Sequence, residues 1–192
     1  MKHRDEKIVF QGKIVEVVQY PVQANGQESI FEKARRSPGV RVLIETPSGG
    51  FILNKEKRHE LGLKEDWRLP GGKVFDSLAS YNEFLAGQKD EKEIIEKAKE
   101  AAIKEAVEET GLEPVEIEFL TISTCGTTME WDLYYFVVRK YKEVKRDLKE
   151  TEALEILETK EFSKEELKNL ALSGAMQEDR SVAVILKYLN GK

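Results

Sequence analysis

The chain has 192 residues, enough for one domain with a sizeable core, and carries a net charge of −5. Charged residues make up 35% of it without forming a long basic stripe, which excludes a protein that coats nucleic acid. The N-terminus lacks an apolar signal core, and no run approaches the ~20 apolar residues of a membrane span. The single cysteine, Cys125, excludes an intrachain disulfide. We therefore expect a cytoplasmic protein without membrane or nucleic-acid partners.

Short strands with many Val and Ile residues open the chain. Residues 8–20 predict two strands around a bend at Gly12. Asn25 and Gly26 form a hairpin-turn pair, so residues 30–34 predict the returning strand. These strands have little core of their own to cover them, and we therefore expect a second copy of the chain to bury them.

A Ser-Pro-Gly sequence at 37–39 marks the boundary of the main domain. We assign residues 1–36 to N-terminal strands that form a dimerisation element, and residues 37–192 to the main domain. In the second unit, strands are predicted at 40–46 and 50–54, joined by a hairpin turn at 47–49. A polar stretch follows at 55–66. That stretch leads to the sequence Leu69-Pro70-Gly71-Gly72.

A long helix is predicted from about residue 91 to 110, after a segment at 73–90 that reads as a loop with room for one helical turn. Asp90, followed three residues later by Glu93, is typical of a helix start. Gly111 fits the left-handed position that ends a helix. One face of this helix is apolar and then becomes acidic; its members are Ile94, Ile95, Ala98, Ala101, Ala102, Glu105, Glu108 and Glu109.

Carboxylates on one helix face repel each other unless a cation lies among them. Glu105, Glu108 and Glu109 therefore predict a site for a hard cation such as Mg²⁺, which also binds substrate phosphates. The alternative is a solvated acidic helix end. Acidic residues at a helix C-terminus oppose the macrodipole and cost stability there, which favours the cation site.

The rest of the chain predicts three strands and two helices. The strands cover 115–124, 131–140 and, more briefly, 153–158. Ser163 with Glu166 opens a helix that runs to about 172, and Asp179 caps a last helix at 180–190. Strands on both sides of a buried helix, with a late helix pair, indicate an α/β class fold: an α/β/α sandwich with a mixed sheet.

The Gly71-Gly72 turn and the acidic end of the helix together resemble the Nudix hydrolase family. The pattern of that family is G-x5-E-x7-R-E-U-x-E-E-x-G-U, where U is a bulky aliphatic residue. The matching residues are Gly72, Glu96, Glu105, Glu108, Glu109, Gly111 and Leu112. Lys104 replaces the family's Arg, and Ala106 replaces an aliphatic. The resemblance implies a Nudix-like sandwich with a short N-terminal strand pair. The order of the predicted elements along the chain is most similar to that of the ADP-ribose pyrophosphatase branch, in which N-terminal strands commonly build a homodimer.

The spacing between Gly72 and Glu96 departs from the pattern, with 23 residues, 73–95, in place of five. In an unbroken helix, the side chain of Glu96 shares a face with Ile103 and Val107, away from the acidic cluster. Whether Glu96 binds the metal therefore stays open. The extra residues form an insertion at about 73–90, with large apolar side chains that should pack on something: Phe75, Leu78, Tyr81, Phe84 and Leu85. We expect it to cover the diphosphate pocket or a dimer seam; a passive surface excursion is the alternative.

The resemblance assigns roles to individual residues. Glu105 and Glu109 are the first candidates to bind Mg²⁺, with Mn²⁺ as a substitute, and Glu108 is the third. The resemblance also implies the carbonyl of Gly71 as a further ligand, and glycine at 71 and 72 would let the backbone approach the metal and substrate closely. Water then attacks one phosphorus of a diphosphate and releases a nucleoside monophosphate.

Other residues are weaker candidates. Family members often take a general base from a late loop, and Glu152 is our choice among Glu150, Glu152 and Glu155, against a solvated charge run. Arg58 and Arg68 could bind phosphates, since guanidinium groups suit bidentate contacts, although surface ion pairing explains them equally well. A base could stack on Trp131, but a tryptophan in such a strand is more often part of the core.

We therefore expect a Mg²⁺-dependent hydrolase that cleaves the diphosphate bond of a nucleoside diphosphate derivative such as ADP-ribose or a nucleotide sugar. Two alternatives remain: a hydrolase of oxidised nucleotides or dinucleoside polyphosphates, and a nucleotide-sensing module that kept the fold and lost turnover. All three helix carboxylates are present, which argues against the sensor.

Overall fold

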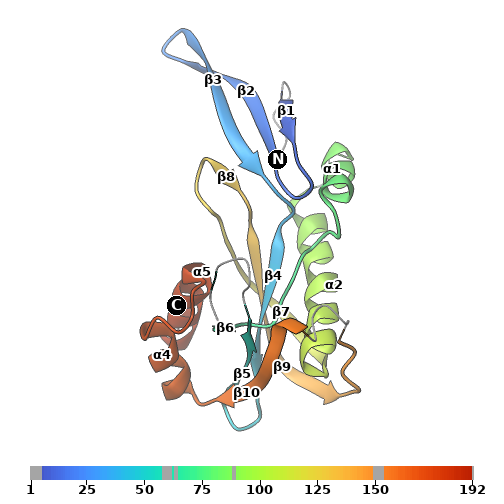
Figure 1. Cartoon of the computed structure of the whole chain (residues 1–192), viewed down its shortest axis with the longest axis vertical. Helices are drawn as coiled ribbons and strands as arrows, with labels where there is room; N and C mark the ends of the chain where they lie inside the picture. The colour runs from blue at the N-terminus through green and yellow to red at the C-terminus, as the bar shows by residue number, and fades with distance from the viewer. Residues whose placement is uncertain (1–5, 58–61, 63–64, 88–89, 149–153, 192) are drawn as a thin grey trace.

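The computed structural model describes residues 6–57, 62, 65–87, 90–148 and 154–191 (Figure 1). Its centre is a mixed sheet with the strand order β10-β5-β4-β9-β7, in which β6 pairs with β5. The strands are β4 (Gly39–Glu45), β5 (Phe51–Glu56), β6 (Asp66–Arg68), β7 (Leu112–Ser123), β9 (Leu133–Glu143) and β10 (Ile156–Phe162). The β4–β9 pair is parallel and the other pairs of this sheet are antiparallel.

Helices cover both faces of this sheet (Figure 1). Alternate residues of β4 and β9 face α2 (Glu91–Thr110), whose small Ala98, Ala102 and Ala106 are fully buried and let the helix lie close to the strands. The other face packs against α4 (Lys164–Leu172) and α5 (Asp179–Leu189). The predicted α/β/α sandwich with a mixed sheet is therefore confirmed.

A second sheet, in the order β1-β2-β3-β8, extends beyond the sandwich (Figure 1). It contains β1 (Lys7–Gln11), β2 (Glu16–Ala24), β3 (Gln27–Arg35) and the two-residue β8 (Met129–Glu130). Asn25 and Gly26 both have positive φ angles, 54° and 76°, as the predicted hairpin turn requires. Much of the large apolar surface of the protein lies on these strands; its members include Ile8, Val9, Phe10, Ile30 and Phe31.

A buried ion-pair cluster fastens this second sheet to the rest of the protein. Arg35, which is fully buried, contacts the carboxylates of Glu6, Glu16 and Glu130. Glu130 lies on β8, which stands in the chain between β7 and β9 of the central sheet, so the cluster connects the N-terminal strands to that part of the chain through charge as well as through the β3–β8 pairing.

The insertion forms a helix longer than the expected single turn. Helix α1 (Leu78–Ala86) follows a capping box at Ser77, and its Asn82 donates a hydrogen bond of 2.8 Å to Glu16 of β2. The ring of Phe75 lies 5.2 Å from that of Tyr81 and 5.1 Å from that of Phe84. The apolar side chains of the insertion therefore pack, as expected, and the helix adjoins the N-terminal sheet. Its effect on substrate choice stays a prediction.

Both ends of α2 lie where the sequence predicts them. The helix begins at the Asp90–Glu93 capping box and ends at Gly111, whose φ is 71°. The prediction that Asp179 caps the last helix was wrong. Asp179 is the first helical residue, and the preceding Glu178 makes no capping bond because arginines of the sheet occupy its carboxylate. Strands β6 and β8 were not predicted, since three and two residues are too short to show alternation.

None of the helices in the described residues is long and apolar enough to span a membrane.

Candidate functional site

The Gly-Gly turn lies between strand β4 and the end of α2. The amide of Val40 donates to the carbonyl of Gly72 at 3.0 Å, and that of Val42 donates to Pro70 at 2.9 Å. Gly71 has a φ of +156°, and a Cβ there would stand 2.1 Å from the Val40 carbonyl oxygen, so only glycine fits. A Cβ on Gly72 would stand 2.2 Å from Oε1 of Glu105. The turn thus brings bare backbone against the acidic end of α2.

Glu109 is the most deeply placed of the helix carboxylates. Its side chain is only 6% exposed, and its Oε2 accepts hydrogen bonds from the side chain of Asn54 at 2.8 Å and from the amide of Gly71 at 3.0 Å. Burial raises the pKa of Glu109 well above its usual range, and the charges of Glu56 and Glu105 raise it further. This carboxylate is therefore held in place among other negative charges.

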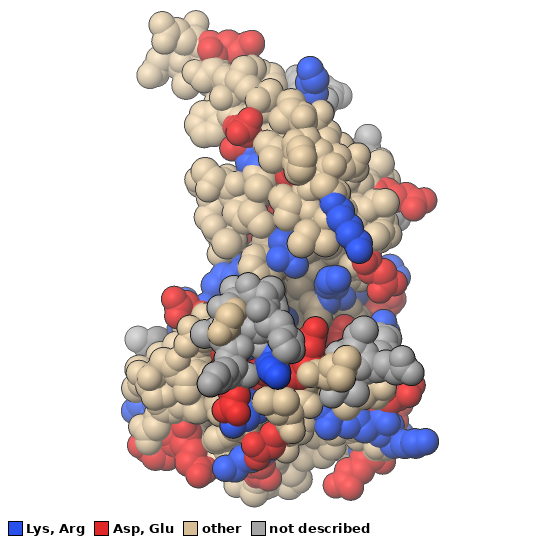
Figure 2. Space-filling model, viewed as in Figure 1, with Lys and Arg blue, Asp and Glu red and all other residues tan. Residues whose placement is uncertain are grey.

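A pocket of about 330 Å³, which we call the carboxylate pocket, lies in front of these residues. It is lined by Glu56, Gly71, Gly72, Lys73, Asp76, Lys104, Glu105, Glu109, Glu155 and Ile156. Figure 2 shows acidic side chains in a recess near the middle of this face, with basic side chains above them. The predicted residues Glu105, Glu109, Gly71 and Gly72 are thus brought together around one space.

A second pocket of about 190 Å³, the arginine pocket, adjoins the first. Its lining residues are Arg36, Ser37, Pro38, Gly39, Arg41, Glu56, Arg68, Gly71, Gly72, Lys73, Trp131 and Leu133. The two pockets share Glu56, Gly71, Gly72 and Lys73. They therefore form one continuous site with an acidic end and a more basic end.

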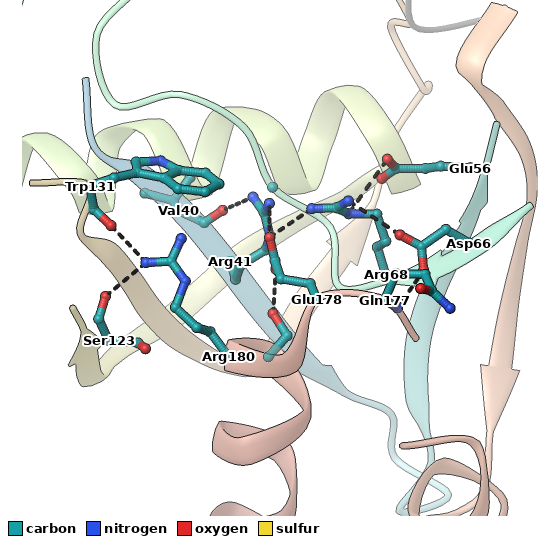
Figure 3. Close-up of polar contacts among 12 residues, drawn as sticks. Val40, Arg41, Glu56, Asp66, Arg68, Ser123, Trp131, Gln177, Glu178 and Arg180 are labelled. Carbon is teal, nitrogen blue, oxygen red and sulfur yellow. Dashed lines mark hydrogen bonds and ion pairs between the residues drawn. The ribbon is translucent and has the colours of Figure 1, made fainter. Parts of the chain in front are cut away.

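Glu178 joins Arg41 and Arg68, two arginines that line the arginine pocket (Figure 3). Its carboxylate accepts bonds of 2.7 Å from Nε and Nη2 of Arg41 and from Nη2 of Arg68. Burial alone would raise the pKa of Glu178, but Arg41 and Arg68 outweigh burial and lower it to about 2. Arg68 also contacts Asp66 at 3.2 Å. The predicted phosphate contact Arg68 thus lines a pocket while being held by carboxylates.

Trp131 stands between two guanidinium groups. The guanidinium carbons of Arg36 and Arg180 lie 4.2 and 4.3 Å from the ring centroid. Both planar cations therefore lie within cation–π distance of the ring. Arg180 also donates to the Trp131 carbonyl at 2.6 Å (Figure 3). A base that stacks here would meet an arginine, which disfavours direct stacking on Trp131.

The remaining predicted residues lie elsewhere. Arg58 and Glu152 lie outside the described residues. Glu108 is partly buried and lines neither pocket, whereas Glu96 is exposed. Of the alternative bases, Glu155 lines the carboxylate pocket.

Sequence reasoning missed Asn54, Glu56, Arg41 and Glu178. Alternation along β5 could have placed Asn54 and Glu56 on one face, but nothing local marks Glu178.

The lining residues fit a divalent cation. Glu105 and Glu109 lie within reach of each other's charge, and Mg²⁺ usually takes one or two carboxylates while keeping several waters. Within the described ranges, no group of three or more Asp, Glu, His or Cys side chains is already arranged to hold a metal. A cation here would thus complete its shell with water, backbone carbonyl or substrate oxygens.

A family model and a solved structure are similar to this chain. A family model described as "NUDIX domain" matches residues 35–183, which leaves strands β1 and β2 and most of β3 outside. A solved structure titled "Crystal structure of ADP compounds hydrolase" is similar with a TM-score of 0.67 and 15% identity, over 98% of this chain and 93% of that one. At this identity the likeness shows the fold. No curated protein matches the chain.

Proposed function

The chain belongs to the Nudix family, whose hydrolases act on phosphoanhydride bonds, and from this premise we propose that it cleaves the diphosphate bond of a nucleoside diphosphate derivative. One observation carries the proposal. Glu105 and Glu109 of the matched motif, with the Gly71-Gly72 turn, enclose one pocket of about 330 Å³. A nucleotide hydrolase needs such a concave, acidic space to hold both a cation and a diphosphate.

ADP-ribose or a nucleotide sugar is the proposed substrate. Such a molecule has two parts joined by a diphosphate, and the site has two adjoining pockets that share Gly71, Gly72 and Lys73. A diphosphate beside the shared residues would leave one part of the substrate in the arginine pocket. The similar structure titled as an ADP compounds hydrolase supports this preference over oxidised nucleotides or dinucleoside polyphosphates.

We propose Mg²⁺ as the cofactor, held by Glu105 and Glu109, with Glu108 and the Gly71 carbonyl as further candidates. When bound, Mg²⁺ neutralises the diphosphate and acidifies a water. Asn54 and the amide of Gly71 fix the carboxylate of Glu109 in one orientation, at 2.8 and 3.0 Å. Lys73 and Lys104, which line the same pocket, supply positive charge toward the phosphates.

In the proposed reaction, water forms a new P–O bond and the bridging P–O bond breaks. A carboxylate of the late loop takes a proton from the water, and the leaving phosphate keeps the electron pair of the broken bond. The products are a nucleoside monophosphate and a second phosphate compound.

The experiment for this function is a product-release assay on a panel of nucleoside diphosphate compounds, with Mg²⁺ and with a chelator. We expect ADP-ribose or a nucleotide sugar to give the highest kcat/KM and the chelator to abolish turnover. A folded chain that binds nucleotides without turnover would instead support the sensor.

Glu152→Gln is expected to lower kcat about a hundredfold with little change in KM, because a general base acts in the chemical step and not in binding. The acidic limb of the kcat profile should disappear as well. Glu155→Gln is the matched variant from the same segment, and Glu155 lines the carboxylate pocket. If Glu155→Gln loses the acidic limb and Glu152→Gln keeps it, the base is Glu155 and our assignment is wrong.

We also propose a homodimer formed largely by residues 8–34. Ile30 and Phe31 of β3 are 60% and 51% exposed, and Phe10 of β1 is 58% exposed, a concentration of apolar surface that a second copy would bury. Among the described residues, β8 pairs with β3 only at Ala34 and Arg35, so no described strand covers the rest of this β3 edge.

Phe31→Lys should convert the dimer to a monomer, because a charge would replace apolar surface at the interface. Light scattering should report about twice the chain mass for the wild type and one chain mass for the variant. Leu172→Lys is the control, since Leu172 is 63% exposed on α4, far from the N-terminal sheet. A wild-type chain that stays monomeric at high concentration would refute the dimer.

A further inference from the structure

Glu130 is the carboxylate at which β3, β8 and the insertion meet. It is the last residue of β8, and its side chain contacts Lys33 and Arg35 of β3, with 3.1 Å between Nε of Arg35 and the carboxylate. The hydroxyl of Tyr81, on α1 of the insertion, donates to the same carboxylate at 3.4 Å. Arg35 is fully buried and Tyr81 is 6% exposed, so these contacts lie largely inside the protein.

Glu130 carries its charge at neutral pH. Burial alone would raise its pKa, but Lys33 and Arg35 outweigh burial and lower the pKa below its usual range. Removing one partner of a buried ion pair is costly, because the other charge is left without compensation. The side chain of Glu130 is therefore held firmly against β3.

The residues that follow Arg35 and Glu130 in the chain both line the arginine pocket. They are Arg36 and Trp131, and the guanidinium carbon of Arg36 lies 4.2 Å from the centroid of the Trp131 ring. We call this pair the Arg36–Trp131 wall. The amide of Arg36 also donates to the carbonyl of Glu130 at 3.1 Å. Arg35 and Glu130 themselves line neither pocket, so their ion pair lies one residue along the chain from each member of the wall.

Backbone pairing alone fixes this wall weakly. Strand β8 has two residues, which pair with Ala34 and Arg35, and each backbone hydrogen bond contributes only modestly to stability. At the wall itself, Arg180 donates to the carbonyl of Trp131 at 2.6 Å (Figure 3). Charged side chains thus anchor the segment at Trp131 and at the residue before it, Glu130.

We infer that Glu130 is a positioning residue for the arginine pocket. Through its ion pairs with β3, it holds the Arg36–Trp131 wall in the place where one part of the substrate binds. The inference rests on the proposed function, because it assigns Glu130 to the binding step of the same reaction. The competing explanation is structural: Glu130 only fastens the N-terminal sheet to the rest of the protein.

The first test is steady-state kinetics of Glu130→Gln with the substrate that the wild type turns over fastest. The variant should raise KM about tenfold and change kcat less than about twofold, because a displaced wall weakens binding and leaves the carboxylates of α2 intact. Glu16→Gln is the matched control. Its fully buried carboxylate contacts the same Arg35 at 3.1 Å, but no described residue of β2 lines either pocket. It should lower Tm at least as much as Glu130→Gln and keep the wild-type KM.

Two kinetic outcomes would overturn the inference. One is a folded Glu130→Gln with the wild-type KM, and the other is an equal rise of KM in Glu16→Gln, because general loosening of the cluster would explain both variants. If Glu130→Gln does not fold, Glu130→Asp replaces it, since it keeps the charge but is one methylene shorter. It should raise KM by less, and a wild-type KM there, or failure of both variants to fold, would count against the inference as well.

Trp131 fluorescence reports on the wall without turnover. The chain has two tryptophans, so Trp67→Phe in every chain compared leaves Trp131 as the sole tryptophan. Trp67 lies against Phe162, with 4.7 Å between the ring centroids, and lines neither pocket. Acrylamide should quench Trp131 faster in Glu130→Gln than in the parent chain, because Arg36 would no longer be held against the ring, while Glu16→Gln should match the parent. Parent-like quenching in folded Glu130→Gln would refute the positioning role.

The two readouts separate failure of this inference from failure of the proposed function. If the wild type hydrolyses no nucleoside diphosphate compound, the proposed function fails, and quenching alone still decides whether Glu130 holds the wall. If the wild type hydrolyses such a compound and Glu130→Gln matches it in KM and in quenching, only the role of Glu130 is wrong.

Discussion

Glu109→Gln is expected to lower kcat about a thousandfold, a loss of roughly 4 kcal/mol of transition-state stabilisation, while the protein stays folded. Glu105→Gln should have a similar effect. Glu109 is held by Asn54 and by the amide of Gly71, so its carboxylate already stands where the proposed cation would bind. An amide keeps the shape of this side chain but loses the charge that a hard cation requires.

The same substitution should not weaken the metal-free protein. Burial and the charges of Glu56 and Glu105 raise the pKa of Glu109 well above its usual range. A raised folded-state pKa means that this group favours folding at low pH and that its contribution is lost as pH rises. Glutamine imitates the neutral form, so the variant should melt at or above the wild-type temperature in neutral buffer with a chelator.

Steady-state kinetics with saturating Mg²⁺, together with melting curves, decide this prediction. Glu96→Gln is the comparison variant, because Glu96 fits the order of the family motif but is exposed on α2. It should change kcat less than about twofold. A folded Glu109→Gln with a near-normal rate would remove the metal assignment, and a large loss in Glu96→Gln would return Glu96 to the site.

Local sequence patterns were sufficient for the helix end of the site. The Asp90–Glu93 capping box and Gly111 limit α2, and its apolar stripe leads directly to Glu109. Helical periodicity acts over a few residues, so sequence alone reveals which side chains share this face. The Asn25-Gly26 turn was readable for the same reason.

The parts that sequence did not reveal depend on contacts between distant segments. Asn54 meets Glu109 across 55 positions, and Glu178 meets Arg41 across 137. Such pairs leave no local pattern, because each partner alone looks like an ordinary polar residue at the end of an element. The sequence predicts no more than one helical turn in the insertion because its helix, α1, spans only nine residues, and contacts with β2 and β8 hold it in place.

Glu178→Gln is expected to destabilise the protein by about 3 kcal/mol at neutral pH, because it leaves the guanidinium groups of Arg41 and Arg68 buried without their shared carboxylate. Both arginines are less than a tenth exposed and bond Glu178 at 2.7 Å (Figure 3). The lowered pKa of Glu178 gives the same magnitude: it falls from 4.5 to about 2, which corresponds to about 3 kcal/mol.

The pH dependence identifies this cause. Since folding lowers the pKa of Glu178 from 4.5 to about 2, its stabilising contribution is complete well above pH 4.5 and disappears as pH falls toward 2. Urea unfolding of wild type and Glu178→Gln across this range should therefore give free energies of unfolding that converge at low pH. Glu165→Gln, an exposed change on α4, should follow the wild type at every pH. A constant difference between wild type and Glu178→Gln down to pH 2 would mean that lost packing, and not lost charge, destabilises the variant.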